Sequence, residues 1–266
     1  MCMERYDWNP SDYAAHSQAQ YQWAGEIIGK LELNGTESVL DLGCGDGKVT
    51  ALLASRVPQG CVTAIDSSSS MVRLAREKYP HSQNPGISFL EMDAMDIRFV
   101  DQFDLVFSNA ALHWVPDHAR MLQGVSRCLK SQGRIFFQMG GHGNASDILD
   151  LADEMIRSEH WKEYFRDFAS PYHFLTHNEY RVLLEDAGLI PVRVELILKD
   201  MAQAGKEGLS GWIRTTWLPY TERVPNSASD RFISDLAELY LERYPPDSEG
   251  LVHVRMVRLE VEARKP

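Results

Sequence analysis

A glycine-rich turn near the start of the chain stands between an apolar segment and a helix-like segment. The apolar segment is "SVLDL", residues 38–42, and the turn that follows is "GCGDG", residues 43–47. Residues 47–57, "GKVTALLASRV", then have the apolar spacing of a helix, which stops before Pro58. A strand, a tight turn and a helix in this order are typical of a parallel α/β sheet whose turn lies at the ligand-binding edge.

The alternation of strand and helix continues through the first half of the chain. The apolar patterns predict strands over 38–42, 61–66, 87–93, 103–109 and 134–140, and helices over 19–33, 47–57, 67–79 and 117–130. Strands separated by helices in this way pair in parallel through right-handed crossovers. We therefore expect an α/β fold with a doubly wound, mostly parallel sheet.

The second half of the chain has a different pattern. Residues 144–187 and 205–245 are mostly helical in character, whereas residues 191–199 and 251–263 alternate apolar and polar side chains as strands do. The last segment has the pattern of an edge hairpin strand. We expect a single domain, residues 1–266, in which the two helical inserts cap the ligand edge of the sheet.

Composition disfavours several classes of protein. The net charge of −11 argues against a surface that follows nucleic-acid phosphates. The four cysteines are dispersed and form no C-x-x-C pair, so we expect neither a metal site nor a disulfide framework. The N-terminus lacks the apolar stretch of a signal peptide, and no apolar run is long enough to span a bilayer. These features indicate a cytoplasmic protein without nucleic-acid or membrane partners.

Two acids in and beside the glycine turn restrict its ligand. A dinucleotide fingerprint, G-x-G-x-x-G, that begins at Gly43 needs a third glycine where this chain has Lys48. Asp41 and Asp46 would also repel a pyrophosphate. S-adenosylmethionine, which carries an ammonium beside its carboxylate, suits the turn better. Its ammonium can approach Asp41 through the loop or a bridging water, while backbone N–H groups take its carboxylate.

Residues farther along the chain fall where the other parts of this ligand need them. Asp66 ends the second predicted strand, where an acid can accept both ribose hydroxyls. The thioether of Met71 could cover one face of the adenine. Asp93 could accept a hydrogen bond from the adenine amino group, and Asn109 ends the fourth strand beside the reactive methyl group. The ordered set predicts a site for S-adenosylmethionine.

Residues 36 to 140 resemble the class I S-adenosylmethionine-dependent methyltransferases. The segments "VLDLGCGDG", "AIDSSSSM", "FLEMDAMDI" and "FDLVFSNAALHWV" match the family's cofactor motifs in order and spacing. The resemblance implies a seven-stranded Rossmann-like sheet of order 3-2-1-4-5-7-6, with an antiparallel last strand, and S-adenosylhomocysteine as product. It also implies cofactor contacts by Asp41, Gly43, Cys44, Gly45, Asp66, Ser67, Met71, Asp93, Ala94 and Asn109.

A narrower resemblance involves both ends of the chain. The segments "DWNPSDYAAHS", "SNAALHWVPDH", "FFQMGGHGN" and "GWIRTTWLPY" are similar to those of trans-aconitate methyltransferases and juvenile-hormone-acid-type methyltransferases. Those enzymes make methyl esters of small carboxylic acids. In them an N-terminal aromatic segment folds over the cofactor. The resemblance therefore implies that residues 1–35 contribute a lid and the first helix, with Trp8, Tyr13 and Ser17 as lid residues.

One position departs from the trans-aconitate pattern. That pattern has an arginine between the leucine and the proline of the late helical motif, but here Leu218 directly precedes Pro219. A tricarboxylate favours bidentate arginine partners, and Arg214 is the nearest substitute in the motif. The departure favours an acid with less charge than trans-aconitate.

The substrate-side candidates lie just past the fourth and fifth predicted strands. His113 and Trp114 follow the fourth strand, and Gln138 ends the fifth. A carboxylate acceptor is already ionised at pH 7 and needs no general base. A phenol or an amine would benefit from one, and the candidate bases are His113, His142 and His16.

Three functions remain open at this point. The leading one is O-methylation of a small carboxylic acid by a monomeric enzyme. The second is a methyltransferase for another acceptor, such as the free carboxyl of an acyl-carrier thioester, as in biotin synthesis, or a nitrogen or carbon centre. A carrier-protein partner would require a basic patch, which the acidic net charge does not favour. The third is a non-catalytic module that binds S-adenosylmethionine.

Overall fold

The computed structural model describes residues 18–266, with side chains from residue 23 onward, and divides them into two compact units. We name them the sheet unit (residues 18–142, Tyr172–Ile197 and Arg258–Pro266) and the helical unit (Gly143–Pro171 and Leu198–Val257). The predicted lid residues Trp8, Tyr13 and Ser17 lie outside the described residues.

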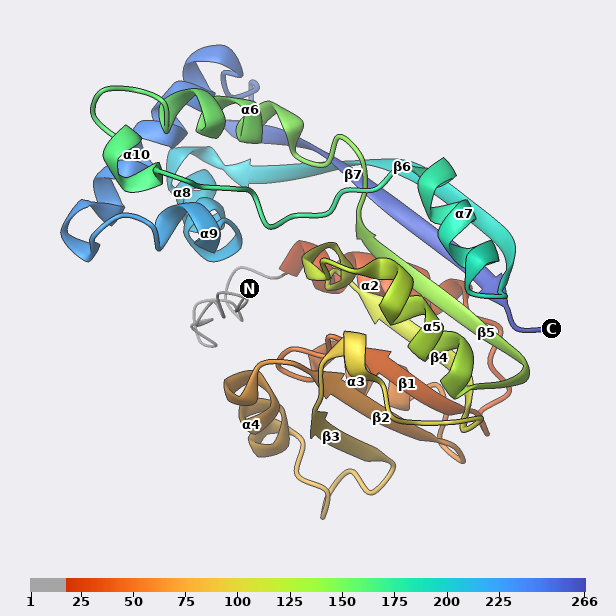
Figure 1. The fold of residues 1–266 in the computed structure, drawn as a ribbon. Helices are drawn as coiled ribbons and strands as arrows, with labels where there is room; N and C mark the ends of the chain where they lie inside the picture. Colours follow the sequence, from red (N-terminus) through yellow and green to blue (C-terminus); the bar gives the residue numbers. More distant parts are fainter. Residues whose placement is uncertain (1–17) are drawn as a thin grey trace. The chain divides into compact units, whose positions relative to one another are not determined.

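The sheet contains seven strands in the order β3-β2-β1-β4-β5-β7-β6 (Figure 1). β1 to β5 pair in parallel, and β7 runs antiparallel to β5. This arrangement confirms the predicted fold class and strand order. The strands are β1 Ser38–Leu42, β2 Cys61–Asp66, β3 Ile87–Glu91, β4 Phe103–Asn109, β5 Leu129–Gly140, β6 Ile190–Ala204 and β7 Leu251–Arg264.

The helices begin and end close to the predicted positions. In the sheet unit they are α2 Gln18–Lys30, α3 Lys48–Ala54, α4 Ser69–Lys78, η1 Ala94–Asp96, η2 Leu112–Trp114, α5 His118–Cys128 and α7 His177–Asp186. In the helical unit they are α6 Ser146–Met155, η3 Lys162–Phe165, α8 Gly205–Thr216, α9 Leu218–Thr221 and α10 Asn226–Arg243. The N-cap of α4 is Ser68, whose hydroxyl accepts from Met71 N at 3.3 Å.

The two faces of the sheet are covered by different helices. Successive side chains of β5 point to opposite faces of the sheet. Phe136 lies on the face covered by α2 and α3, whereas Ile135 and Phe137 lie on the face covered by α5 and α7. Each face buries a continuous apolar cluster, and such burial contributes about 25 cal/mol per Å² of apolar surface removed from water. The two clusters hold the parallel strands in register, so the carboxyl ends of β1, β2, β3 and β4 share one edge.

The prediction that the last segment forms an edge strand is wrong. β7 lies between β5 and β6, and β6 is the edge strand. The error has a physical cause: Arg258 and Glu260 make the sequence alternate, yet both side chains are buried, at 4% and 1% exposure. The helix predicted over 117–130 also ends early, because β5 already begins at Leu129.

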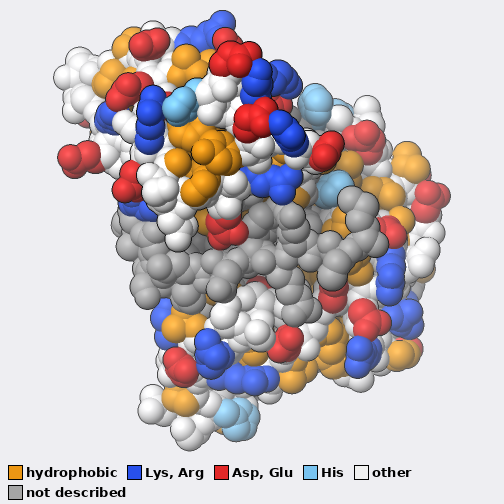
Figure 2. Space-filling model, turned by 60° about the vertical axis from the view of Figure 1, so that its left-hand side comes forward, with side chains coloured by type: hydrophobic (Ala, Val, Ile, Leu, Met, Phe, Trp, Pro, Cys, Tyr) orange, Lys and Arg blue, Asp and Glu red, His pale blue; other side chains and the backbone are white. Residues whose placement is uncertain are grey.

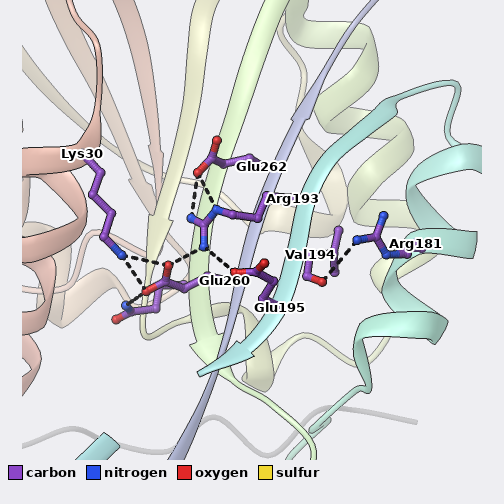
Figure 3. A network of polar contacts seen from close by, with 8 residues as sticks. Lys30, Arg181, Arg193, Val194, Glu195, Glu260 and Glu262 are labelled. Atoms are coloured by element: carbon purple, nitrogen blue, oxygen red, sulfur yellow. Dashed lines mark hydrogen bonds and ion pairs between the residues drawn. The ribbon is translucent and has the colours of Figure 1, made fainter. Parts of the chain in front are cut away.

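The buried carboxylate of Glu260 holds four elements together (Figure 3). It accepts from Lys30 Nζ of α2 at 3.1 Å, from Gln138 Nε2 of β5 at 3.1 Å and from Arg193 Nη1 of β6 at 2.8 Å. Arg193 also donates to Glu262 at 2.7 Å. Burial alone would raise the pKa of Glu260, but Arg193, Lys30 and Gln138 together lower it.

Removal of this carboxylate should destabilise the sheet unit strongly. We expect Glu260→Ala to lower the free energy of unfolding by about 3–5 kcal/mol, because Arg193 and Gln138 lose a buried partner. Glu195, which also pairs with Arg193 but is 54% exposed, is the matched control; Glu195→Ala should cost about 0–1 kcal/mol.

Urea unfolding of the two variants measures the difference. Because the folded-state pKa of Glu260 is lowered, its stabilising effect is present above the unfolded-state pKa and is lost as the pH falls through the folded-state pKa. The gap between wild type and Glu260→Ala should therefore narrow in acid. Equal losses for the two variants at pH 7 would contradict the role assigned to Glu260.

Candidate functional site

The turn after β1 requires glycine for two different reasons. Gly43 and Gly45 have φ values of +73° and +54°, in a region of backbone conformation that residues with a side chain rarely adopt. A Cβ on Gly43 would lie 2.2 Å from Cβ of Ala111 in the β4 exit loop, so packing excludes it. A Cβ on Gly45 would meet no atom of residues 18–266 within 4 Å. These residues therefore leave space beside the backbone of Gly45, where a ligand can approach it closely.

Asp66, at the end of β2, links this turn to the start of α4. Its Oδ2 accepts from Gly45 N at 2.9 Å, and its Oδ1 accepts from Ser68 N at 2.8 Å. Burial raises the pKa of Asp66, although these two backbone donors work in the opposite direction. The acid predicted for ribose thus lies directly against the glycine turn.

Asp41, the acid on β1 just before the turn, is almost fully buried, with 2% of its surface exposed. Its Oδ2 accepts from the hydroxyl of Thr50 in α3 at 2.6 Å. Burial, assisted by the negative charge of Asp66 and opposed by Thr50, raises the pKa of Asp41 to about 7. A buried carboxyl in this state is stabilised by a nearby cation. The turn therefore fits a ligand with an ammonium, as S-adenosylmethionine has.

The other predicted cofactor residues follow the same edge of the sheet (Figure 1). Met71 is buried in the first turn of α4, and Cys44 is buried in the glycine turn. Asp93 is exposed and caps η1, where its Oδ1 accepts from Met95 N at 2.8 Å. The remaining three lie at the ends of β2, β3 and β4: Ser67 follows β2, Ala94 begins η1, and Asn109 is the last residue of β4.

His113, in η2 just past β4, is fixed in one protonation state by its surroundings. Its Nδ1 accepts from Gly140 N at 3.4 Å, which places the ring proton on Nε2. Burial, together with the charges of Arg258 and His118, lowers the pKa of His113 to about 3. The imidazole is therefore neutral at pH 7 and has an N–H donor at Nε2.

Three aromatic rings surround His113. The ring centroids of Trp114, Tyr172 and Phe174 lie 5.8, 6.2 and 5.8 Å from the imidazole. Tyr172 and Phe174 are stacked, and the backbone of His173 between them donates to the carbonyl of His113 at 2.8 Å. The predicted pair of His113 and Trp114 thus belongs to an aromatic cluster in which the imidazole supplies a neutral N–H donor.

The other substrate-side candidates have different surroundings within their own units. Gln138 is buried, and its amide donates to Glu260 in the sheet unit. Arg214 has an exposed side chain on α8 of the helical unit. Among the candidate bases, His142 is exposed and His16 lies outside the described residues.

Arg258 of β7 is a buried charged residue that none of the sequence motifs contains. Its guanidinium lies 4.5 Å from the ring centroid of Trp23 in α2, and Arg258 is opposite Gly140 in the β5–β7 register. The available signal was the spacing of two charged residues, Arg258 and Glu260, which lie two apart and alternate with the apolar residues 257, 259 and 261. That spacing puts both on one face of the sheet.

The molecular surface shown in Figure 2 has charges of both signs. Lys and Arg side chains are interspersed with Asp and Glu side chains over the coloured part of this face. Between residues 18 and 266, none of the helices is both long and apolar enough to cross a membrane.

Comparison with known proteins gives a consistent picture. The methyltransferase domain family matches residues 39–133. The trans-aconitate 2-methyltransferase of Shigella flexneri serotype 5b is 30% identical over 260 residues, which is 97% of this chain and 98% of that protein. The trans-aconitate 2-methyltransferase of Escherichia coli K12 is 29% identical over the same shares of both chains.

Solved structures share the fold. YcgJ of Bacillus subtilis superimposes with a TM-score of 0.62 at 15% identity, over 92% of this chain and 98% of that one. A geranyl diphosphate methyltransferase in complex with SAM gives 0.58 at 16% identity, over 94% and 87%. With the full-length relatives and the sheet order, these matches show that the chain belongs to the class I S-adenosylmethionine-dependent methyltransferases, in the group of the trans-aconitate methyltransferases.

Proposed function

We propose that this methyltransferase transfers a methyl group to a carboxylate oxygen of a small acid and so forms a methyl ester. The observation that carries the proposal is the state of His113. Its Nδ1 lone pair is engaged by Gly140, and its lowered pKa of about 3 makes it a poor base. An amine or a phenol would leave a proton to be removed, whereas a carboxylate is ionised at pH 7.

The names of the relatives support the same acceptor class. The Shigella and Escherichia proteins are trans-aconitate 2-methyltransferases, and this chain aligns with them over 97% of its length. Bound S-adenosylmethionine supplies a sulfonium methyl group: a carboxylate oxygen forms the O–C bond while the C–S bond breaks and its electron pair stays on sulfur. The protein's part is to hold the acceptor in line in a site without water.

The residues at the strand ends have distinct proposed roles toward the cofactor. Asp66 accepts from the ribose hydroxyls, and Asp41 faces the ammonium through the glycine turn. The space beside Gly45 leaves room for the amino-acid chain of the ligand, and backbone N–H groups at the start of α3 take its carboxylate. Met71 and Asp93 contact the adenine. The remaining members of the proposed set are Gly43, Cys44, Ser67, Ala94, Asn109 and the lid residues Trp8, Tyr13 and Ser17.

We propose further roles for the surroundings of the site. The helical segments 144–187 and 205–245 cap the acceptor side, where Arg214 supplements the charge of the site. The net charge of −11 supports a small-molecule partner over nucleic acid. We further propose that the enzyme is cytoplasmic and monomeric. Sedimentation of the purified protein tests its oligomeric state.

A labelled-methyl assay tests the reaction. Purified protein is incubated with methyl-labelled S-adenosylmethionine and a panel of small acids that includes trans-aconitate, and the product is then treated with mild alkali. We expect volatile labelled methanol, because alkali hydrolyses methyl esters. Label that survives alkali would instead indicate methylation of nitrogen, carbon or an ether oxygen. Label found only on an added acyl-carrier thioester would indicate a carrier-bound acceptor.

Asp66→Asn tests the ribose contact. We expect about tenfold weaker binding of S-adenosylmethionine, since a charge-assisted hydrogen bond is lost while Asn can still accept from one backbone N–H. Calorimetric titration measures the dissociation constant. Asp96→Asn is the matched control, because Asp96 is an exposed acid near the same edge that pairs with Arg98. Equal affinities for wild type and Asp66→Asn would exclude the contact.

Asp41→Asn tests the ammonium contact through two measurements that should change in opposite directions. The stability of the cofactor-free protein at pH 8 should rise, and the affinity for S-adenosylmethionine should fall. The pKa of Asp41 is raised from 3.8 to about 7, so the ionised group destabilises the ligand-free fold, and stability falls as the pH rises between these values. The shift of about three units corresponds to about 4 kcal/mol at most, at 1.36 kcal/mol per unit.

The variant should therefore be more stable than wild type at pH 8 without cofactor, and nearly equal to it at pH 4. At pH 8 it should also bind S-adenosylmethionine about tenfold more weakly, because the ammonium loses a charged partner. Thermal unfolding at both pH values and a binding titration at pH 8 measure the two effects. A variant that keeps the wild-type pH profile of stability would show that Asp41 is not the titrating group.

A further inference from the structure

A pocket of about 390 Å³ lies within the helical unit, at the C-terminal end of α6. Its lining comes from one continuous stretch of chain, residues 153–170, which runs from α6 through η3 into the following loop. Pockets that hold small molecules in proteins measure about 300–1,000 Å³, so this one has room for a small ligand. None of the cofactor motifs contains these residues.

One part of the lining is aromatic. The rings of Phe165 and Phe168 stand edge to face, with their centroids 5.4 Å apart. Each ring also contacts a ring from another helix: Phe165 stacks on Phe232 of α10, and Phe168 lies 4.8 Å from Tyr220 of α9. Because these contacts hold both rings in place, they offer a fixed surface to a flat apolar group.

The other part of the lining carries two cations and one acid, namely Arg157, Lys162 and Asp153. Asp153 is already engaged, since its Oδ1 accepts from the hydroxyl of Tyr220 at 3.1 Å. Its Oδ2 lies 3.9 Å from Arg157, a long distance for an ion pair. A guanidinium has five N–H donors, so Arg157 can bind a second carboxylate without losing the first.

Lys162 pairs with an acid that is not part of the lining. Its Nζ lies 2.6 Å from Glu159, three residues earlier in the chain, and the side chain of Glu159 is 91% exposed. An ion pair this exposed is weak, because water screens it and both long side chains lose freedom. A ligand anion in the pocket can therefore compete with Glu159 for Lys162.

The two parts of the lining match a ligand with two parts. A cationic ligand would be repelled by Arg157 and Lys162. A small hydrophilic anion would leave the rings of Phe165 and Phe168 uncovered, and a neutral apolar molecule would leave the cations unused. An organic anion with a ring uses both parts, and the planar fork of arginine favours a carboxylate as the anionic group.

We propose that this pocket binds a monocarboxylate with a flat apolar body. The body lies against Phe165 and Phe168, and the carboxylate lies toward Arg157 and Lys162. The inference goes beyond the proposed function, because it concerns binding and holds whichever acid is methylated. An acceptor and an effector of the enzyme would share this chemistry, and the experiment distinguishes them.

The test uses 4-fluorohydrocinnamate and its neutral isostere, 4-fluorohydrocinnamamide. Each is titrated with protein saturated with S-adenosylhomocysteine, and the fluorine NMR signal gives the dissociation constant. Wild type should bind the acid about fivefold more tightly than the amide, the ratio expected for two partly exposed ion pairs. High salt should bring this ratio toward one, because it screens pairs at the surface. Excess acetate, which lacks the ring, should not displace the acid.

Substitutions of the charged residues should change the ratio in both directions. Arg157→Gln and Lys162→Gln should each lower it about twofold, and the double variant should bring it to about one. Glu159→Gln should instead tighten binding of the acid about twofold, because Lys162 loses a competing carboxylate. Arg231→Gln is the matched control: Arg231 of α10 is an exposed arginine with an i,i+4 acid partner, as Arg157 is. It should leave the ratio unchanged.

The variants should fold, because the substituted side chains are between 44% and 91% exposed. Their unfolding midpoints and their affinities for S-adenosylhomocysteine should equal those of wild type. A folded double variant that keeps the wild-type ratio overturns the proposal. So does wild type that binds the acid and the amide equally, or binds neither.

Incubation of 4-fluorohydrocinnamate with methyl-labelled S-adenosylmethionine then identifies the role of the bound acid. Alkali-labile label on the acid means that the pocket serves the acceptor, and the Arg157 and Lys162 double variant should then raise its KM. Acid that binds but stays unlabelled means that the pocket serves an effector. Both results support the pocket. If no acid of any kind is methylated, the proposed function fails, whereas charge-dependent binding of the fluorinated acid still supports the pocket.

Discussion

The buried carboxylate of Glu260 is the interaction on which most of the sheet unit depends. It joins α2, β5, β6 and β7 through one anion with three donors, so a strand from the chain's end lies inside the sheet instead of at its edge. Charge inside a sheet is tolerated only when it is paired. The same face of β7 carries Arg258 two residues earlier, which places a cation near the glycine that ends β5.

Local sequence was sufficient to predict the first half of the fold. The glycine turn, the serine cap of α4 and the apolar periods depend on residues close in the chain, and the ordered motifs implied the strand order. The interior position of β7 depends instead on partners far away: Gln138 and Glu260 are separated by 122 residues. Without that pairing in view, alternating Arg and Glu side chains indicate an exposed edge.

The candidate site, like the fold, could be predicted only in part from the sequence. The predicted strands were sufficient to locate Asp41, Asp66 and Asn109 at one edge of the sheet, because the carboxyl ends of parallel strands meet there. The protonation state of His113 could not be predicted, since it results from burial, from Arg258 and from a backbone N–H of another strand. Spacing thus locates residues, whereas their electrostatic state requires the tertiary arrangement.

The raised pKa of Asp41 has a consequence for turnover. Under the proposed contact this carboxyl faces the ammonium of the cofactor, and the demethylated product keeps the same ammonium. The contact is thus equally favourable before and after methyl transfer, so it strengthens binding without lowering the chemical barrier. The spent cofactor competes on equal terms for the glycine turn. If Asp41 makes this contact, accumulated product should therefore slow the enzyme by occupying the same turn as the donor.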